Sequence, residues 1–458
     1  DNGIGMEKAD LEKNIGTIAN SGTKAYLKSL KEENSSNFDA EEFIGQFGVG
    51  FYSAFMVADK VEVITKKLGS ENAYKWVSEG TGSYSIEDTT KEESGTEIIL
   101  HLKKEEEDAE HKFNKYLNTS EIESLIKKYS DYIRYPINMD FSEPVYEKDE
   151  NGNPKYGEEP KEYEVVNKTI NSMIPLWKKN KSDIEEKEYS EFYKSKFHDW
   201  EEPLKTLHYS VEGNIDFTAM LFIPKRAPHD FYAPDYKSGL SLYSKNIFIM
   251  ENCEELLPDY LKFVKGLVDS TDFSLNISRE ILQQSRQLKV IKKNVEKKIL
   301  GLLKEMLDED KENYLEFYKQ FGVALKHGVY ADFMNQSGAK DKLKDLLLFE
   351  TSKNTTPISL KQYIEAMDEK QEFIYYAIGD SVEMIKALPQ MEILKEKDIE
   401  VLYLTEKVDE FCIDSLKEYD GKNFKSITKG DLDISKEDKE KKEDRKSTRL
   451  NSITWPSR

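Results

Sequence analysis

The sequence predicts an α+β protein, with an N-terminal domain that carries glycine-rich turns and a layered αβα second domain that includes a helical segment. Three observations predict this class. Helical spacing and strand signals alternate over residues 1–142. Residues 143–165 are acidic and contain clustered Pro and Gly, which indicates a linker. Over residues 166–430, strand-like runs accompany a long amphipathic helix.

The first domain begins with a helix signal. Leu11, Ile15 and Ile18 fall at helical spacing, which predicts a helix over 7–20. The polar segment 21–42 lies between two glycines, and two interpretations stay open: a mobile cover or ordinary surface structure.

Strand signals follow. Residues 61–64 are apolar and β-branched, and 96–102 alternate with Thr96 on the apolar face. A helix is expected over 120–133.

In the second domain, strands are expected at 217–223, 247–249 and 401–404. One helix has apolar residues three and four apart, namely Leu288, Ile291, Val295, Ile299, Leu302 and Met306. Residues 431–458 form a charged segment, and its last part, 447–458, is basic and rich in Ser and Thr. This end is either native or foreign to the protein.

Composition excludes several classes of function. The net charge of -21 argues against a general nucleic-acid binder and against docking on anionic lipid. The two cysteines, Cys253 and Cys412, are far apart without zinc spacing, so we expect no metal centre and a reducing, cytoplasmic location. No apolar run approaches the ~20 residues of a membrane span, so we expect no membrane partner.

Two glycine motifs predict a nucleotide site. Asp1 begins an Asp-x-Gly-x-Gly turn, and Gly45 begins a Gly-x-x-Gly-x-Gly loop. A carboxylate can accept a hydrogen bond from an exocyclic amine, and glycines let backbone amides approach phosphate. The Lys-Ser/Thr pair of a Walker A loop is replaced by Phe51-Tyr52, and the third glycine of a dinucleotide fingerprint is replaced by Ser53.

These two motifs, with Gly95-Thr96 before a strand, resemble the nucleotide fold shared by gyrase-type topoisomerases, sensor histidine kinases, mismatch-repair ATPases and the ninety-kilodalton heat-shock chaperones. The resemblance implies a two-layer α/β sandwich for the first domain. Several segments are similar to the heat-shock chaperones specifically, closest to their bacterial members, and they are residues 16–24, 44–55, 175–177, 222–228 and 275–284. The resemblance covers the chain to about residue 430.

The resemblance implies ATP as cofactor and a role for each motif residue. Asp1 takes the adenine amine, Met6 packs on the base, Asn14 lies near the sugar, and Thr96 bonds within the adenine pocket. The residues expected around the turns and phosphates are Gly5, Gly22, Gly48, Val49, Gly50 and Phe51. Without the family, Asp1 would be an acidic turn residue and Thr96 the first residue of a strand.

Catalytic roles are implied for Arg279 and for Gln283, which lies four residues on and so on the same helix face. The arginine would reach the γ-phosphate, since a guanidinium is always charged and offers several donors. The plainer interpretation of Arg279 is a surface salt bridge, worth under ~1 kcal/mol. Trp177 and the pair Phe231-Tyr232 are either exposed partner contacts or core residues.

The chain also departs from the family pattern. Intact members carry, before the position of Asp1, a Glu that activates water and an Asn that holds Mg²⁺, so we expect the Mg²⁺ ligand upstream and negligible turnover for the polypeptide as written. Asn20 stands where many relatives have a lysine. The C-terminal dimerisation domain is expected only in a longer parent protein, which would be a homodimer.

The function that the resemblance implies is an ATP-dependent molecular chaperone of the cytoplasm that binds partly folded client proteins. One alternative is a DNA-acting ATPase of the same nucleotide fold, which the acidic charge disfavours. Another is an interaction scaffold without ATP turnover.

Overall fold

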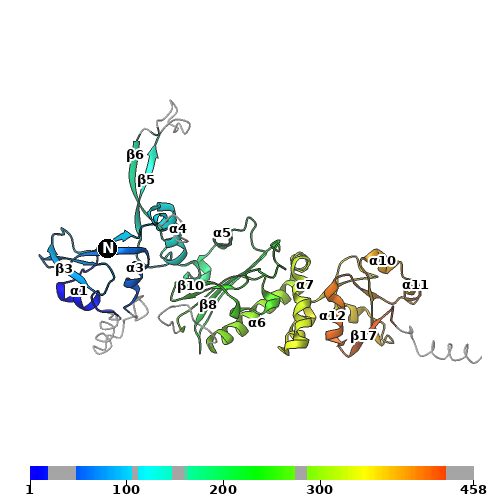
Figure 1. Ribbon diagram of the computed structural model, residues 1–458. Helices are drawn as coiled ribbons and strands as arrows, with labels where there is room; N and C mark the ends of the chain where they lie inside the picture. Colours follow the sequence, from blue (N-terminus) through cyan, green and yellow to red (C-terminus); the bar gives the residue numbers. More distant parts are fainter. Residues whose placement is uncertain (19–47, 106–111, 147–159, 161, 274–285, 430–458) are drawn as a thin grey trace, which may run out of the picture. The chain divides into compact units, whose positions relative to one another are not determined.

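The computed structural model describes residues 1–18, 48–105, 112–146, 160, 162–273 and 286–429 (Figure 1). Contacts between residues divide the chain into two compact units. The first unit comprises Asp1–Lys179, Tyr243–Ile249 and Asp269–Gln283, and the second comprises Asn180–Leu242, Met250–Val268 and Gln284–Arg458. Residue 142, the predicted end of the first domain, lies within the first unit, and the division into domains stays a prediction.

The first unit contains a four-stranded antiparallel sheet in the order β3-β2-β1-β4. The strands are β1 Ala58–Lys66, β2 Ala73–Ser78, β3 Tyr84–Thr89 and β4 Gly95–Leu102. Val61 and Val63 on β1 are fully buried in one cluster with Leu11 and Trp76. The strands predicted at 61–64 and 96–102 are confirmed as parts of β1 and β4. The apolar alternation of β4 does not mark a buried face, since Ile98 is 51% and Leu100 is 41% exposed.

Glu62, on the opposite face of β1, is the centre of a charge cluster. Its carboxylate lies 2.6 Å from Lys60 Nζ, 2.5 Å from Lys75 Nζ and 3.1 Å from His101 Nε2. Hydrogen bonds from Lys60 and then Lys75 lower the pKa of Glu62 to about 2. The carboxylate is therefore ionised over the whole physiological pH range.

Three helices of the first unit are α1 Lys8–Asn14, α3 Ala54–Val57 and α4 Thr119–Tyr129. The helix predicted over 7–20 is shorter, since the Gly16 amide bonds back to Leu11 O at 2.8 Å and closes the helix end. Ile18, expected on its buried face, is 71% exposed. Asn118 caps α4 by accepting the Ser120 amide at 2.9 Å.

The predicted linker also differs. β5 Asn138–Val145 pairs antiparallel with β6 Glu162–Thr169, so both ends of segment 143–165 belong to a two-stranded ribbon (Figure 1). Between the strands, residues 147–159 and 161 lie outside the described ranges. Most side chains of β6 are exposed, which explains why charged residues hid the strand signal.

A five-stranded sheet has the order β10-β9-β11-β8-β7. Its strands are β7 Lys205–Val211, β8 Phe217–Ile223, β9 Leu240–Ser244, β10 Ile247–Cys253 and β11 Lys265–Ser270. All seven residues of β8 are buried, as expected from the continuous apolar run predicted there.

Two long helices follow in the second unit, α6 Arg286–Glu309 and α7 Lys311–Asn335. The predicted amphipathic helix is confirmed as α6, with Leu303 rather than Leu302 fully buried. Shorter helices are α5 Glu186–Phe197, α8 Ala339–Leu343, α9 Leu360–Ala366, α10 Val382–Lys386, α11 Pro389–Glu396 and α12 Lys407–Leu416. Throughout the described ranges, no helix combines the length and apolar character needed to cross a bilayer.

The second unit ends in a six-stranded mixed sheet in the order β13-β12-β15-β14-β17-β16. Its strands are β12 Leu348–Thr351, β13 Ile358–Ser359, β14 Phe373–Ile378, β15 Val401–Leu404, β16 Glu418–Tyr419 and β17 Lys422–Ser426. β14 runs parallel to both β15 and β17. Helices connect these parallel strands, as such pairing requires.

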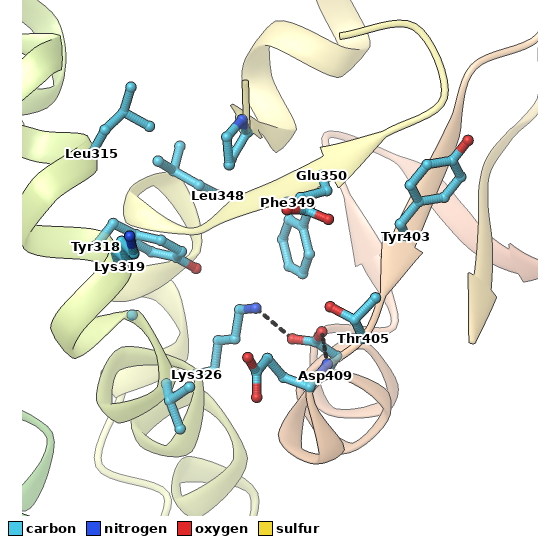
Figure 2. A pocket seen from close by; sticks show the side chains of 14 residues that line it. Leu315, Tyr318, Lys319, Lys326, Leu348, Phe349, Glu350, Tyr403, Thr405 and Asp409 are labelled. Carbon is cyan, nitrogen blue, oxygen red and sulfur yellow. Dashed lines mark hydrogen bonds and ion pairs between the residues drawn. The ribbon is translucent and has the colours of Figure 1, made fainter. Parts of the chain in front are cut away.

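A buried ion pair joins α7 to α12 (Figure 2). Lys326 Nζ lies 2.5 Å from Asp409 Oδ1, and the side chains are only 7% and 2% exposed. Lys326 Nζ also lies 5.0 Å from the centre of the Phe349 ring. The pair borders a pocket of about 410 Å³ between α7, β12 and the start of α12. The Glu406 amide donates a further hydrogen bond to Asp409 Oδ2 at 3.0 Å.

The structure places the aromatic residues that had two open interpretations. Trp177 is 1% exposed, and its Nε1 donates to Asp269 Oδ2 at 3.0 Å, so it is a core residue. Phe231 is fully buried as well. Of these three aromatic residues, Tyr232 alone is exposed, at 53%.

Candidate nucleotide-binding site

The acidic turn is tied to the start of β4. The Asp1 nitrogen donates to Thr96 O at 2.7 Å, and the Thr96 amide donates to Asp1 O at 3.1 Å. The Asp1 carboxylate accepts the Gly3 amide at 2.9 Å through Oδ1. A carboxylate has about four lone-pair positions, so this exposed side chain keeps capacity to accept a ligand amine.

Two glycines are required for this arrangement. Gly5 has φ +62, and a Cβ there would lie 1.9 Å from Lys66 O. Gly95 has φ +125, and its Cβ would lie 2.1 Å from Asp1 O. Both positions combine left-handed backbone with contact to another chain segment, so only glycine lets the turn pack against the sheet.

Thr65 joins the two motifs, although it is not among the predicted site residues. Its hydroxyl accepts the Met6 amide at 3.0 Å, donates to Gly95 O at 3.2 Å and lies 3.0 Å from the Thr96 hydroxyl. Thr65 is opposite Thr96 in the β1–β4 register. The sequence signal for Thr65 was its position next to a predicted strand. Pairing it with Thr96 required the register of β1 against β4, which the sequence does not show.

Met6 and α1 continue the site from the turn. Met6 is partly buried against the cluster that contains Leu11, Val63 and Trp76. A capping box begins α1, in which the Glu7 amide donates to Asp10 Oδ2 at 3.1 Å. This bond, with Lys67 nearby, lowers the pKa of Asp10.

Asn14 stands at the end of α1. Its Oδ1 atom is buried and has no hydrogen-bond partner among the described residues. A buried acceptor without a donor costs free energy, on the order of 1–3 kcal/mol. A hydroxyl of a bound ligand would supply that donor.

The glycine loop is held against the end of α1. Gly48 has φ +66, and residues Gly50–Ser53 form a short 3₁₀ helix before α3. The Tyr52 hydroxyl donates to Ile15 O at 2.5 Å. Phe51 packs edge-on against Trp76, with ring centres 5.6 Å apart, in the same cluster that covers Met6.

The loop leaves backbone amides available. The Tyr52 amide donates to Val49 O at 3.2 Å, whereas the amides of Gly50 and Phe51 have no acceptor among residues whose placement is described. A Cβ at Gly50 would meet no atom within 4 Å, so the space beside it is open. Free amides beside open space are suited to bind phosphate oxygens.

The described residues thus present a carboxylate on the turn tied to β4 and, at the glycine loop, two amides without an acceptor among the described residues. Of the predicted residues, Met6 and Phe51 pack on one core cluster, and the backbones of Asp1 and Thr96 are hydrogen-bonded to each other. The other described ones lie in the segments that adjoin these contacts, and they are Gly5, Asn14, Gly48, Val49 and Gly50. Their individual roles in binding stay predictions.

The remaining site residues, Gly22, Arg279 and Gln283, lie outside the described residues, as does Asn20. Within the described part of the chain, no group of three or more His, Cys, Asp or Glu side chains is placed to hold a metal ion.

Comparison with protein families agrees with this geometry. Residues 1–108 match the model described as histidine kinase-, DNA gyrase B- and HSP90-like ATPase. Residues 115–454 match the model described as Hsp90 protein. The two matches meet between the end of β4 and α4.

Curated relatives are similar along nearly the whole chain. "Chaperone protein HtpG" of Oceanobacillus iheyensis is 48% identical over 444 residues, which cover 97% of this chain and 68% of the relative. The Bacillus subtilis protein of that name is 48% identical over 455 residues, or 99% of this chain and 70% of the relative. That of Shouchella clausii is 49% identical over 443 residues, or 97% of this chain and 68% of the relative.

These matches confirm the predicted fold class and the resemblance drawn from the motifs. The Hsp90 family model matches most of this chain, and the relatives are 48% identical to it, so the chain belongs to the Hsp90 family.

Proposed function

We propose that this chain contributes the ATP-binding and client-binding domains of an ATP-dependent molecular chaperone. The observation that carries the proposal is the Asp1 turn, whose backbone is hydrogen-bonded to Thr96 and whose carboxylate accepts the Gly3 amide, in a chain whose relatives are named chaperone proteins. A family match alone would not distinguish an ATP-responsive protein from a scaffold. The site residues make that distinction testable.

Each part of the site has a separate task in this proposal. The Asp1 carboxylate accepts the adenine amine, and the Thr65–Thr96 hydroxyl pair fixes the surrounding turn. Met6 covers the base with apolar surface. The free amides of Gly50 and Phe51 donate to phosphate oxygens, where a negative charge strengthens each hydrogen bond.

Hydrolysis and coupling are also part of the proposal. Arg279 stabilises charge at the γ-phosphate, and Gln283, four residues further along the sequence, assists it. Bound Mg²⁺ neutralises phosphate charge, and its ligand is expected upstream of Asp1 in the family. Nucleotide binding then drives opening and closing that changes the surface offered to partly folded clients.

The proposed setting is the cytoplasm, which suits the free, buried thiols of Cys253 and Cys412. Homodimerisation through a C-terminal domain of a longer protein completes the proposal, as the family resemblance implies. No described residue is assigned to that contact.

Aggregation of a chemically unfolded reporter protein tests the function. Light scattering is followed with the purified chain and with ATP, ADP or no nucleotide, and Asp1→Asn is the matched variant. We expect suppression of aggregation that changes with nucleotide in the parent chain but not in Asp1→Asn. Suppression that ignores nucleotide in both would support a scaffold instead. Tight DNA binding at physiological salt would support the DNA-acting alternative.

A further inference from the structure

A small basic pocket in the second compact unit differs from the acidic character of the chain. It has a volume of about 230 Å³ and lies between the end of α5, the start of β9 and the residues before β11. Four lysines line it, namely Lys196, Lys237, Lys262 and Lys265, together with His198. Glu251 is the one acidic side chain among its described lining residues.

Within the described residues, three of these lysines have no carboxylate partner. Among the described ion pairs, none involves Lys237, Lys262 or Lys265. Aromatic rings hold two of them instead. Lys262 Nζ lies 4.7 Å from the centre of the Phe231 ring, and Lys265 Nζ lies 5.9 Å from the Tyr193 ring. Rings position an ammonium group but do not neutralise its charge.

Burial increases the need for a counter-ion. Lys265 is partly buried, and this desolvation lowers its pKa. The carboxylates of Asp199 and Asp230 act on it only from a distance. An anion in the pocket would offset the desolvation of this ammonium group.

Negative groups in the pocket are outweighed. Glu251 contributes one negative charge, and the C-terminus of α5 at Phe197 contributes about half a charge. Counted over the lining side chains and the helix end alone, without the more distant Asp199 and Asp230, the four lysines leave an excess of about two positive charges beside a space of about 230 Å³. A single carboxylate would compensate only part of that excess.

Neutral donors complete the lining. Ser238 and Ser241 carry hydroxyl groups, and Gly239 has φ +128 where a Cβ would lie 2.8 Å from the Cys253 carbonyl carbon. Glycine thus lets the β9 backbone pass close to β10 at the pocket wall. Compact ligands with several negative oxygens match this combination of lysines and hydroxyls.

We propose that this pocket binds a phosphate group with two or more negative charges, either on a small phosphorylated metabolite or on a phosphorylated side chain. The site is separate from the nucleotide site and does not depend on the proposed chaperone function. Its concave shape and small volume favour a single phosphate or pyrophosphate group over an extended polyanion.

Calorimetric titration with inorganic pyrophosphate tests the site in the full 458-residue chain. The glycine-loop amides are also proposed to bind phosphate, so only the difference between the pocket variants and the control is attributed to this pocket. Lys237→Gln removes an exposed lysine of the pocket, and Lys265→Met removes the partly buried charge. Lys187→Gln is the matched control, since Lys187 is exposed on α5 and pairs with Glu191.

We expect Lys237→Gln to weaken pyrophosphate binding about tenfold, since a charge-assisted hydrogen bond is lost. Lys187→Gln should leave it unchanged. A phosphoserine peptide that binds more tightly than pyrophosphate would identify a modified protein as the source, and weaker peptide binding would identify a free metabolite. The proposal is overturned if neither probe binds, or if both pocket variants bind like the control.

Discussion

Gly95→Ala tests how the adenine end of the site is built. A Cβ at Gly95 would lie 2.1 Å from Asp1 O, whereas ordinary contacts begin near 3.4 Å. Asp1 must therefore move away from β4 by more than an ångström. The two backbone hydrogen bonds between Asp1 and Thr96, at 2.7 and 3.1 Å, cannot survive that displacement.

The magnitude follows from these two hydrogen bonds and from the backbone conformation at residue 95. Each hydrogen bond contributes about 1 kcal/mol to the free energy of unfolding, and a left-handed conformation costs a non-glycine residue about 1–2 kcal/mol. The expected loss in stability of the first compact unit is about 3–4 kcal/mol in total. Adenine-nucleotide affinity should fall more than tenfold, because the Asp1 carboxylate no longer faces the ligand.

Gly69→Ala is the matched control. Gly69 also has a positive φ, +81, but a Cβ there would meet no atom within 4 Å. This variant should lose only the conformational contribution, about 1 kcal/mol, and keep nucleotide affinity.

Urea unfolding measures the stability of both variants. Hydrogen exchange measures the protection of the Thr96 amide, and calorimetry measures nucleotide affinity. If Gly95→Ala matches Gly69→Ala in all three, the Asp1–Thr96 contact does not organise the site.

Three further predictions concern stability and reactivity. Lys326→Met should destabilise the second unit by about 3–5 kcal/mol in urea unfolding, because it leaves Asp409 buried without its cation. The double variant Lys326→Met/Asp409→Leu should recover much of this loss, and equal losses for the single and double variants would contradict the prediction. The pKa of Glu62 is about 2, below its ordinary 4.5, so its stabilisation is complete above pH 4.5 and disappears as the pH falls toward 2. Glu62→Gln should therefore lower the Tm of the first unit at about pH 7, by an amount that shrinks toward about pH 3, and a pH-independent difference would count against the ion cluster. Burial raises the pKa of both Cys253 and Cys412 to about 12, so a disulfide reagent at about pH 8 should label them only after unfolding, and rapid labelling of the native chain would show that they are accessible.

Elements with a strong period were predictable from the sequence. β4 and β8 are marked by apolar alternation or a continuous apolar run, and α6 by apolar residues on one helical face. The β5–β6 ribbon has the composition of a linker, since β6 is almost wholly exposed and one face of β5 is only partly buried. The end of α1 was not predictable, because the Gly16 cap overrides the spacing that continues to Ile18.

The site was predictable to the extent that its motifs are local. Asp1 and the glycine loop could be identified from residue type and order. Thr65 could not, because its contacts with Met6 and Thr96 depend on the register of β1 against β4. The buried Asn14 oxygen was likewise invisible without the packing around α1.

The central claim is that the Asp1 carboxylate and the amides of Gly50 and Phe51 belong to one adenine-nucleotide site. Calorimetric titration of a nonhydrolysable ATP analogue into the chain and into Asp1→Asn tests it most directly. We expect one bound nucleotide per chain, with affinity at least tenfold weaker in Asp1→Asn since a charge-assisted hydrogen bond is lost. Equal affinity in the two proteins, or no heat of binding in either, would contradict it.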